Sequence, residues 1–313
     1  MMKIAVFMGG SSPEREVSLN SGKEIINALR EKGYTVTPYD VEWVGKHTLF
    51  SAVEECCRNG TDVVFLALHG GLGENGGIQG VLEAAGLIYT GSGIRASAIA
   101  MDKDLSKKIF VQNNIATASW VSGTWETIDT SHFKRELDYP YIVKPVDQGS
   151  TIGLSLVKEH SELPAALEEA ARYSRKIMIE LFIPGSELTV PILGNKALPV
   201  IEIRPSHLIY DYECKYTPGM TEYLVPAPIT AKLSSEISSI ALNVFNILGL
   251  RDFGRIDFRL DIYGRPLCIE ANTLPGMTST SLVPKSARAA GIEFPELVSR
   301  IAEMAYQRGA NIS

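Results

Sequence analysis

Short apolar segments rich in β-branched residues alternate with helical patterns over the first hundred residues, and this alternation limits the possible folds more than any other feature of the sequence. In order, the segments indicate strand, helix, strand, helix, strand and helix at residues 3–8, 17–30, 34–41, 46–58, 62–68 and 77–85. Strands that alternate with helices form a parallel sheet covered by helices, and the loops that follow the strands gather at one edge. Residues 1–100 are therefore expected to form a parallel α/β domain.

The pattern changes after a long helical segment at residues 95–112. The segments that follow it indicate a helix at 162–174 and strands at 141–144, 154–158 and 176–181. This mixture predicts a second, smaller α+β unit over residues 101–185, with the glycine-rich segment DQGSTIG between its first two strands.

A third unit is expected over residues 186–313. Two strands, a helix at 232–248, two more strands and two helices are indicated there, interrupted by a stretch at 204–228 that has no clear period. A long irregular segment inside a compact protein is usually a functional loop or lid. The segment 204–228 is therefore a candidate part of a binding site.

Composition excludes several classes of protein. With 21% charged and 45% apolar residues, the chain has the balance of a soluble globular protein, and its net charge of -6 argues against a nucleic-acid partner. The four cysteines show no CxxC spacing, so a zinc site is not expected. The start of the chain, MMKIAVFMGG, has an apolar run too short for a signal peptide or a membrane span, so we expect a cytoplasmic protein without a membrane partner.

Two glycine patterns resemble dinucleotide-binding fingerprints without the residues that such a site needs. Residues 71–76 match GxGxxG and residues 91–96 match GxGxxA. Neither is followed, about 20 residues later, by the acidic residue that would hold a ribose. The chain also has no GxxxxGK[ST] segment. Any phosphate binding must therefore use another design.

The most informative local feature is a predicted hairpin formed by FGRIDFRL and LCIEANT. If its turn centres on Tyr263-Gly264, Asp257 lies opposite Glu270 and Arg255 opposite Asn272. Side chains alternate between the faces of a strand, so these four polar groups share one face, while Ile269 and Ala271 point to the other.

A solvent-facing polar side of an antiparallel sheet would explain such a hairpin without any function. Two carboxylates placed opposite each other repel, however, unless a cation lies between them. Asp257, Glu270 and Asn272 offer only oxygen ligands, which suits Mg²⁺ better than zinc. With Arg255 one pair away, the hairpin indicates a site for phosphoryl transfer.

Seven motifs make the chain resemble the D-alanine:D-alanine ligase family of the ATP-grasp superfamily. They are GGSSPEREVSLNSG, HGGLGENGGIQG, MDKDLSK, QGSTIG, DYECKY, RIDF and IEANTLPGMTSTSLVPK, spread over residues 9–285. The resemblance implies an ATP-grasp architecture of three domains: an N-terminal α/β substrate-binding domain (1–100), a central subdomain with a glycine-rich lid (101–185) and a C-terminal catalytic domain (186–313).

The resemblance also implies an ATP site. Asp257, Glu270 and Asn272 would hold two Mg²⁺ ions, with Mn²⁺ as a substitute. Lys103 and Lys144 would bind the phosphates. The lid at 148–153 would cover them. The residues expected at the lid, the adenine and the ribose are Gly149, Thr151, Glu180, Leu181, Phe182, Ile183 and Glu187. Taken alone, the loop is also compatible with a simple hairpin turn, and 180–187 with a core strand that ends in a turn.

For the substrates, the resemblance implies that Glu16 receives the ammonium of a first D-alanine and that Ser150 and Tyr216 hydrogen-bond to that glutamate. Complementing the positive end of a helix is a sufficient reason for Glu16 by itself. His69, at the end of a predicted strand, is either a binding residue or a satisfied core histidine. The other residues implied are Lys215 near the transferred phosphate, Arg255 and the Gly276 N–H at the oxyanion, and Ser281 with the Leu282 N–H at the carboxylate of a second D-alanine.

The activity implied is ATP-dependent ligation of two D-alanine molecules through a D-alanyl phosphate, for peptidoglycan precursors, by a homodimer. Two alternatives stay open. A ligase that joins D-alanine to D-lactate is disfavoured because the ester-forming relatives lack a tyrosine at the position of Tyr216. A catalytically silent ATP-binding module should have lost one of the four polar hairpin residues, and all four are intact.

Overall fold

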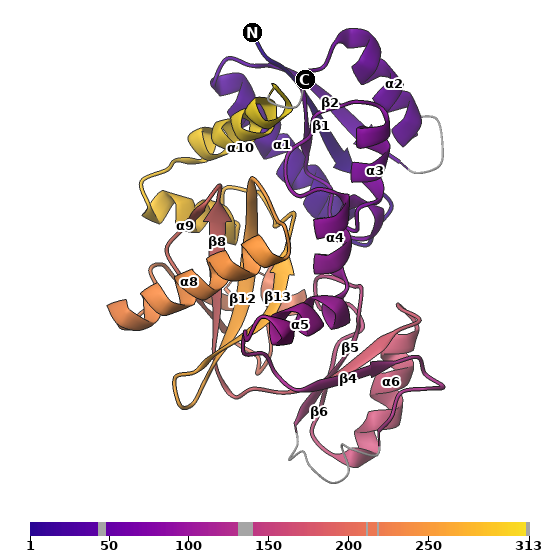
Figure 1. Cartoon of the computed structure of the whole chain (residues 1–313), viewed down its shortest axis with the longest axis vertical. Coiled ribbons are helices and arrows are strands. Elements are labelled where there is room, and N and C mark those ends of the chain that lie inside the picture. Colours follow the sequence, from indigo (N-terminus) through magenta and orange to yellow (C-terminus); the bar gives the residue numbers. More distant parts are fainter. Residues whose placement is uncertain (43–47, 131–139, 211, 218, 311–313) are drawn as a thin grey trace.

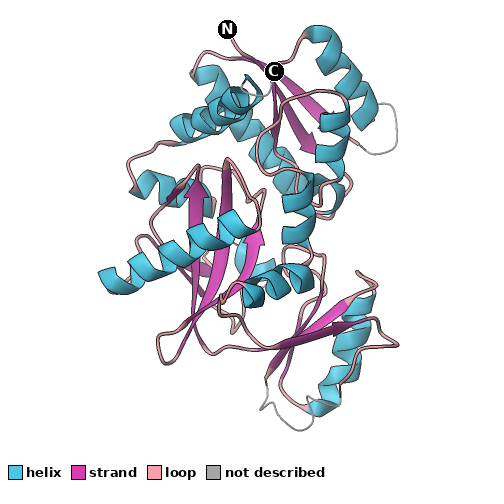
Figure 2. Ribbon diagram, in the orientation of Figure 1, coloured by secondary structure: helices cyan, strands magenta, loops and turns pink. Residues whose placement is uncertain are grey.

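The computed structural model describes residues 1–42, 48–130, 140–210, 212–217 and 219–310. Three units are stacked along the longest axis of the molecule (Figure 1). The N-terminal unit lies at one end, a unit built on the longest strands lies in the middle, and a small sheet with one helix lies at the other end (Figures 1 and 2). The first residues of the helix expected at 46–58 lie outside the described part of the chain.

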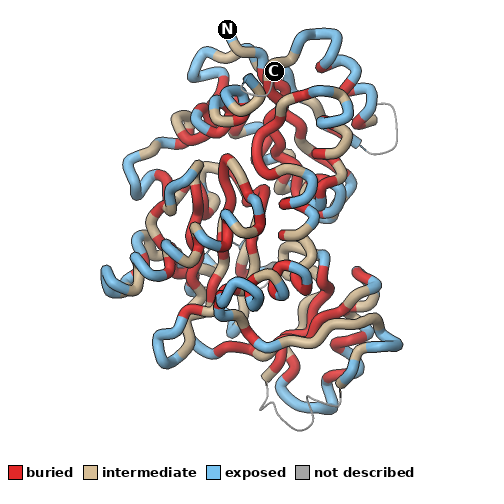
Figure 3. Tube along the Cα trace, in the orientation of Figure 1, coloured by how far each residue is buried: buried red, intermediate tan, exposed pale blue. Residues whose placement is uncertain are grey.

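The N-terminal unit is a three-stranded parallel sheet in the order β2-β1-β3, which confirms the predicted α/β domain. Its apolar strands are buried, because helices cover them (Figure 3). The elements of this unit are β1 (Lys3–Gly9), α1 (Arg15–Glu31), β2 (Thr35–Val41), α2 (Leu49–Asn59), β3 (Val63–Leu66), the short 3-10 helix η1 (Gly71–Gly73) and α3 (Gly77–Ala84).

The central unit is central in the sequence, but it is the small sheet at one end of the molecule (Figure 1). It is antiparallel, in the order β4-β7-β5-β6, with α6 packed against it. Its elements are β4 (Trp120–Gly123), β5 (Tyr141–Pro145), β6 (Ser155–Val157), the 3-10 turn η3 (His160–Glu162), α6 (Leu163–Ala171) and β7 (Ile177–Leu181). The edge strand β4 was missed by the sequence analysis, because WVSG is a short segment without a clear alternation of apolar and polar residues.

The C-terminal unit is a larger antiparallel sheet in the order β11-β10-β8-β12-β13, with the short β9 paired to β8. Its elements are β8 (Gly185–Leu193), β9 (Lys196–Ala197), β10 (Ile201–Pro205), α7 (Tyr212–Tyr216), β11 (Thr221–Leu224), α8 (Ala231–Ile247), β12 (Phe253–Asp261), β13 (Pro266–Asn272), α9 (Leu282–Ala289) and α10 (Phe294–Ala310). The segment 204–228 is therefore not structureless, since α7 and β11 lie within it.

The long helix expected at 95–112 is two helices, α4 (Ile94–Met101) and α5 (Lys103–Gln112). Asp102 breaks it: its backbone is extended (φ -79°, ψ 98°), and its Oδ1 accepts a hydrogen bond from the Leu105 N–H at 2.9 Å. The Lys103 N–H turns away to donate to the Val146 carbonyl at 3.1 Å. The break aims the start of α5 at the central unit.

The hydrophobic cores cross the boundaries expected from the sequence. Apolar residues of α4 and α5, such as Ala100 and Phe110, pack into the core of the C-terminal sheet. Leu297 and Ile301 of α10 belong instead to the core of the N-terminal unit. These crossings join the units, and Figure 1 shows α10, near the C-terminus, lying against the N-terminal sheet. None of the described helices is both long and apolar enough to span a bilayer.

Candidate active site

Two adjoining cavities lie where the three units meet. The first cavity is lined by the central and C-terminal sheets and by the glycine-rich loop. The second cavity is lined by the N-terminal unit, the loop after β13 and the start of α9. The residues that line both cavities are Gly149, Ser150, Tyr210, Lys215, Arg255 and Glu270. A molecule in one cavity can therefore react with a molecule in the other.

The hairpin β12–β13 has the predicted pairing at its functional end. Asp257 lies opposite Glu270 and Arg255 opposite Asn272. The register then shifts, because Phe258 pairs with Cys268 and leaves Ile269 as an extra residue in a β-bulge.

The bulge corrects one part of the prediction. Ile269 lines the first cavity beside Glu270, although strict alternation had assigned it to the opposite face. Ala271 does lie in the core, as expected. The bulge also moves the turn, which runs from Asp261 to Gly264 rather than being centred between Tyr263 and Gly264.

Asp257 is held by three neighbours. Arg255 donates from Nε and from a terminal nitrogen to its two oxygens, both at 2.8 Å. Thr189 Oγ1 donates to Oδ1 at 2.5 Å and Asn272 Nδ2 to Oδ2 at 2.9 Å. The guanidinium therefore balances this carboxylate within the protein, which the sequence analysis did not foresee when it expected two carboxylates that repel.

Glu270 stands beside several cationic side chains. Lys103 Nζ is 3.3 Å from its Oε2. Burial by itself would raise the pKa of the Glu270 carboxyl, but the charges of Lys103, Lys144, Lys215 and Arg255 outweigh burial and lower the pKa to about 2. Glu270 is thus ionised throughout the neutral range.

The oxygen donors on this hairpin fit a hard cation. Two carboxylates and one amide supply only oxygen ligands, as Mg²⁺ and Mn²⁺ prefer. No group of three His, Cys, Asp or Glu residues that could hold a metal occurs in the part of the chain that the structure describes, so the candidate cation site has two carboxylates and the amide of Asn272. The cationic side chains around Glu270 balance the charge of its carboxylate, as bound metal ions would.

Lysines and a buried carboxylate form the inner wall of the first cavity. Glu180, only 3% exposed, accepts from Lys144 Nζ at 2.6 Å and from Lys107 Nζ at 2.5 Å. Burial opposes ionisation, but the two ammonium groups lower the pKa of Glu180. Lys107 was missed by the sequence analysis, although its position one helical turn after Lys103 in MDKDLSKK could have revealed it.

The connector from β7 to β8 forms another wall. Leu181, Phe182 and Ile183 line the first cavity, as does Glu187. Arg259, also missed from the sequence, donates to the carbonyl of Ile183 at 3.0 Å and lies 3.4 Å from Glu187 Oε2. Burial raises the pKa of Glu187 to about 6, because Arg259 and Lys215 offset the loss of water only in part.

The glycine-rich loop at 148–153 is closed over the site. Lys103 Nζ donates to the carbonyl of Gln148 at 2.6 Å. Ser150 and Thr151 have left-handed backbones, with φ of 48° and 61°, and the Thr151 hydroxyl is buried without a hydrogen-bond partner among the described residues. Such strain is uncommon outside functional loops. The loop is therefore more than the simple hairpin turn considered from the sequence.

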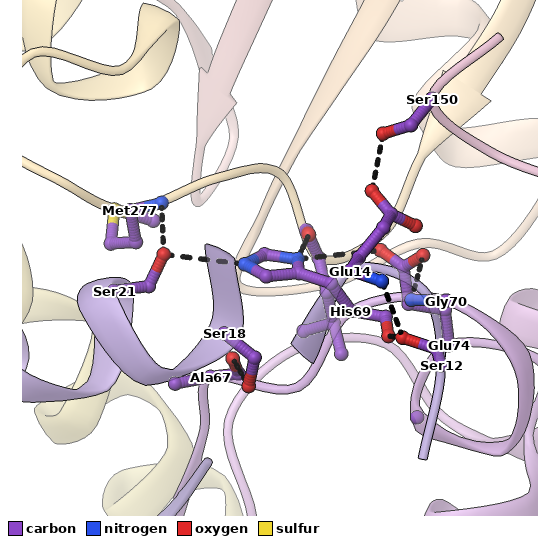
Figure 4. Close-up of polar contacts among 12 residues, drawn as sticks. Ser12, Glu14, Ser18, Ser21, Ala67, His69, Gly70, Glu74, Ser150 and Met277 are labelled. Carbon is purple, nitrogen blue, oxygen red and sulfur yellow. Dashed lines mark hydrogen bonds and ion pairs between the residues drawn. The ribbon is translucent and has the colours of Figure 1, made fainter. Parts of the chain in front are cut away.

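The structure corrects the position of the substrate-side glutamate. Glu16 is exposed on the first turn of α1 and does not line the second cavity. Glu14, just before the helix, is 8% exposed, lines that cavity and accepts a hydrogen bond from Ser150 Oγ (Figure 4). Two residues along a helix rotate a side chain by about 200°, so only one of the two glutamates can face the cavity.

Glu14 lacks a cationic partner in direct contact among the described residues. Burial raises the pKa of the Glu14 carboxyl, and the neighbouring Glu74 raises it further, against the lowering effects of Ser150, His69 and Lys215. A carboxylate in this environment gains stability when an ammonium group binds beside it.

His69 lines the second cavity, but protein groups satisfy its ring (Figure 4). Nδ1 lies 3.1 Å from the carbonyl of Leu274, and Nε2 lies 3.3 Å from Ser21 Oγ. Ser21 Oγ in turn accepts from the Met277 N–H at 3.4 Å. These bonds hold both ends of the segment that contains Gly276, which favours the satisfied histidine that the sequence left open.

The remaining substrate-side residues also gather at the second cavity. Gly276, Ser281 and Leu282 line it. Ser281 stands at the N-cap position of α9, and its hydroxyl accepts from the Thr278 N–H at 3.1 Å rather than from the helix. Lys215 is half-buried near Glu270, and loss of contact with water lowers its pKa. Tyr216 lies in α7, but its side chain is outside the described part of the structure.

Two antiparallel sheets that face each other across a lysine-lined cavity, with oxygen ligands at its floor, define the ATP-grasp class of fold. Two family models match the chain: "D-ala D-ala ligase N-terminus" over residues 3–59 and 49–92, and "D-ala D-ala ligase C-terminus" over 109–303. The chain belongs to the D-alanine–D-alanine ligase family.

Curated relatives and solved structures agree with this assignment. The chain is 45% identical over 307 residues to the D-alanine–D-alanine ligase of Syntrophotalea carbinolica, covering 96% of this chain and 94% of that one. It is also 45% identical over 304 residues to the enzyme of Magnetococcus marinus, with 96% of each chain covered. The D-alanine–D-alanine ligase of Bacillus anthracis has the same fold over 100% of both chains, with a TM-score of 0.88 at 35% identity. The structure of that enzyme complexed with ATP gives 0.86 at 33%.

Proposed function

We propose that this protein joins two D-alanine molecules to D-alanyl-D-alanine with hydrolysis of ATP to ADP and phosphate, as a step toward peptidoglycan precursors. One observation carries the assignment to this site: the two cavities meet at Arg255, Lys215 and Glu270. A phosphate delivered from the first cavity reaches a carboxylate held in the second at this junction, as acyl-phosphate chemistry requires.

The first cavity is proposed to bind ATP. The adenine would contact Glu180 and the connector 181–183, and the ribose would contact Glu187, all of which line the cavity. Lys103, Lys144 and the loop residues Gly149 and Thr151 would surround the phosphates. The ATP complex of the Bacillus anthracis ligase supports this use of the fold.

Asp257, Glu270 and Asn272 are the residues that would hold the metal, proposed to be two Mg²⁺ ions, with Mn²⁺ as a substitute. When bound, these ions would neutralise charge on the phosphates of ATP. The oxygen-only donor set supports this choice of ion.

The chain's own residues would bind and orient the two amino acids. Glu14 would receive the ammonium of the first D-alanine. The carboxylate of that D-alanine would then face the γ-phosphate and attack phosphorus while ADP leaves. The amine of the second D-alanine, after losing a proton, would attack the acyl carbon and expel phosphate. Arg255 and the N–H of Gly276 would stabilise the oxyanion formed in that attack.

The second D-alanine would bind at the start of α9. Ser281 and the Leu282 N–H would hold its carboxylate, since the N-terminus of a helix favours anions. Lys215 would contact the transferred phosphate.

We further propose that the protein is cytoplasmic, because ATP and the wall precursors are made there. We also propose a homodimer, which rests on the family resemblance alone.

The test is ATP turnover by the purified protein with D-alanine, L-alanine, D-lactate and D-serine in parallel, with and without EDTA. We expect ADP and dipeptide only with D-alanine and metal. Ester product with D-lactate at neutral pH would instead support a depsipeptide ligase. Absence of ATP turnover with every acceptor would refute the ligase assignment.

A further inference from the structure

Lys107 is a buried lysine that does not line either cavity and yet contacts a residue of the proposed ATP site. Its side chain is fully buried, with 0% exposure. Burying an ammonium group is costly unless it is paired and hydrogen-bonded. Lys107 meets this requirement through Glu180 Oε1 at 2.5 Å, Thr117 Oγ1 at 2.5 Å and the ring of Trp120, whose centroid is 5.0 Å from Nζ.

The contacts of Lys107 connect two separate parts of the site. Thr117 Oγ1 accepts from Lys107 and donates to the carbonyl of Cys268 at 2.6 Å. Cys268 precedes the bulged Ile269 and Glu270 on β13. A continuous chain of hydrogen bonds therefore runs from Glu180 on β7 of the central unit to the strand that carries the proposed metal ligands.

The helix that carries Lys107 lies between the units it connects. Figure 1 shows α5 between the C-terminal sheet and the central unit. Lys103 and Lys107 are one helical turn apart, so both lie on the same side of α5. Lys103 reaches Glu270 and the loop, whereas Lys107 reaches Glu180 at the other end of the cavity.

Glu180 has two ammonium partners with different roles. Lys144 lines the first cavity, where the phosphates are proposed to bind, whereas Lys107 is not among its lining residues. If Lys144 moves toward ATP, Lys107 still keeps Glu180 ionised and fixed in orientation. An ionised carboxylate accepts a hydrogen bond from the amino group of adenine and repels the carbonyl oxygen of guanine.

We propose that Lys107 is a positioning residue that fixes the Glu180 carboxylate and thereby sets the affinity for ATP and the preference for adenine over guanine. The inference rests on the proposed adenine contact of Glu180. Lys107 itself does not touch the nucleotide.

The test compares Lys107→Met with Lys108→Met. Lys108 is the matched control because it is the next residue of α5, and its side chain is 62% exposed and pairs only with Asp104 at 2.7 Å among the contacts described. For Lys107→Met we expect the KM for ATP to rise about tenfold or more, since a buried charged hydrogen bond is lost. The ratio of kcat/KM for ATP to that for GTP should fall by a similar factor, while the KM for D-alanine stays unchanged. Lys108→Met should match the wild type.

A merely structural role for Lys107 predicts a different result. It would lower the thermal midpoint and leave both nucleotides equally affected. ATP and GTP parameters within about twofold of those of Lys108→Met would overturn the inference, because one charged hydrogen bond is worth more than that. Equal parameters in Glu180→Gln and the wild type would also overturn it, since Lys107 acts through Glu180.

Thr117→Val covers the case in which Lys107→Met does not fold. This variant keeps every charge and removes only the hydroxyl that holds the ammonium. We expect the same pattern with a smaller size: a higher KM for ATP, weaker purine discrimination and an unchanged KM for D-alanine. Unchanged nucleotide parameters in folded Thr117→Val would refute the positioning role. The wild type in the same assay tests the ligase function separately, because loss of ATP turnover there concerns that function alone.

Discussion

Ser150 on the glycine-rich loop donates a hydrogen bond to Glu14 of the N-terminal unit, across a separation of 136 residues. The loop belongs to the central unit, and Ser150 lines both cavities, whereas Glu14 lines the second. The nucleotide cover and the substrate-side carboxylate are therefore linked directly. Closure of the loop and binding of the first amino acid should depend on each other.

Exchange of Glu14 tests which glutamate receives the substrate. Glu14→Gln should lower kcat/KM for D-alanine by about 10- to 100-fold, since it removes a buried charged partner of the ammonium. Glu16→Gln is the matched control, because Glu16 is exposed and lies outside the cavity. Steady-state kinetics at saturating ATP measures both. Equal losses in the two variants would contradict the position assigned to Glu14.

Exchange of the hairpin carboxylates should separate catalysis from stability. Asp257→Asn and Glu270→Gln should each abolish ATP turnover. Asp257→Asn should also cost about 2 kcal/mol of unfolding free energy in urea, because Arg255 loses its buried partner.

Glu270→Gln should cost less stability than Asp257→Asn. Asp257 holds Arg255 through two hydrogen bonds, whereas the Lys103 ammonium, 3.3 Å from Glu270, also donates to the carbonyl of Gln148. Equal stability of Asp257→Asn and the wild type would show that the arginine does not depend on Asp257.

The raised pKa of Glu187 predicts that ATP binding depends on pH. Its pKa is raised to about 6, mainly by burial, so it gains a proton as the pH falls through about 6 and loses an acceptor for the ribose hydroxyls. The KM for ATP should be constant above that pH and rise below it. Glu187→Gln should remove this dependence while raising the KM at neutral pH. An inflection that persists in the variant would assign it to another group.

Limited proteolysis tests closure of the loops. With ATP and D-alanine together, residues 148–153 and 205–228 should be protected from cleavage relative to either ligand alone. Ser150→Ala should show weaker protection, because it lacks the hydrogen bond to Glu14. Equal cleavage with and without ligands would exclude a ligand-dependent lid.

Much of the fold follows from local patterns, and the exceptions have physical causes. The strands β1 and β3 of the N-terminal sheet are continuous apolar runs, as buried parallel strands require, so they were predictable. The break at Asp102 was not, because 95–112 keeps a helical period on both sides of it. The cap that Asp102 forms on α5 and the tertiary bond from the Lys103 N–H to the Val146 carbonyl together stabilise the break.

The site was predicted best where geometry is local. The shared face of Asp257 and Glu270 follows from strand alternation, whereas their predicted pairing rested on a turn centred on Tyr263-Gly264 and is correct because the bulge at Ile269 offsets the different position of the turn. The choice between Glu14 and Glu16 depends on where α1 begins, and helix starts are poorly fixed by sequence. The helical spacing from Lys103 places Lys107 on the same side of the helix, but its contact with Glu180, like the contact of Arg259 with the Ile183 carbonyl, is made only by three-dimensional packing.

The extra residue at Ile269 gives the sheet a freedom that a regular ladder lacks. Without the bulge, only every second side chain of β13 would lie on the face of the sheet that carries the site. Glu270 and Asn272, the proposed metal ligands, would take those positions. Because Ile269 and Glu270 both face the first cavity, β13 presents an apolar side chain and a carboxylate at consecutive positions. Ile269 can therefore contact a ligand in the first cavity while Glu270 stays beside Lys103.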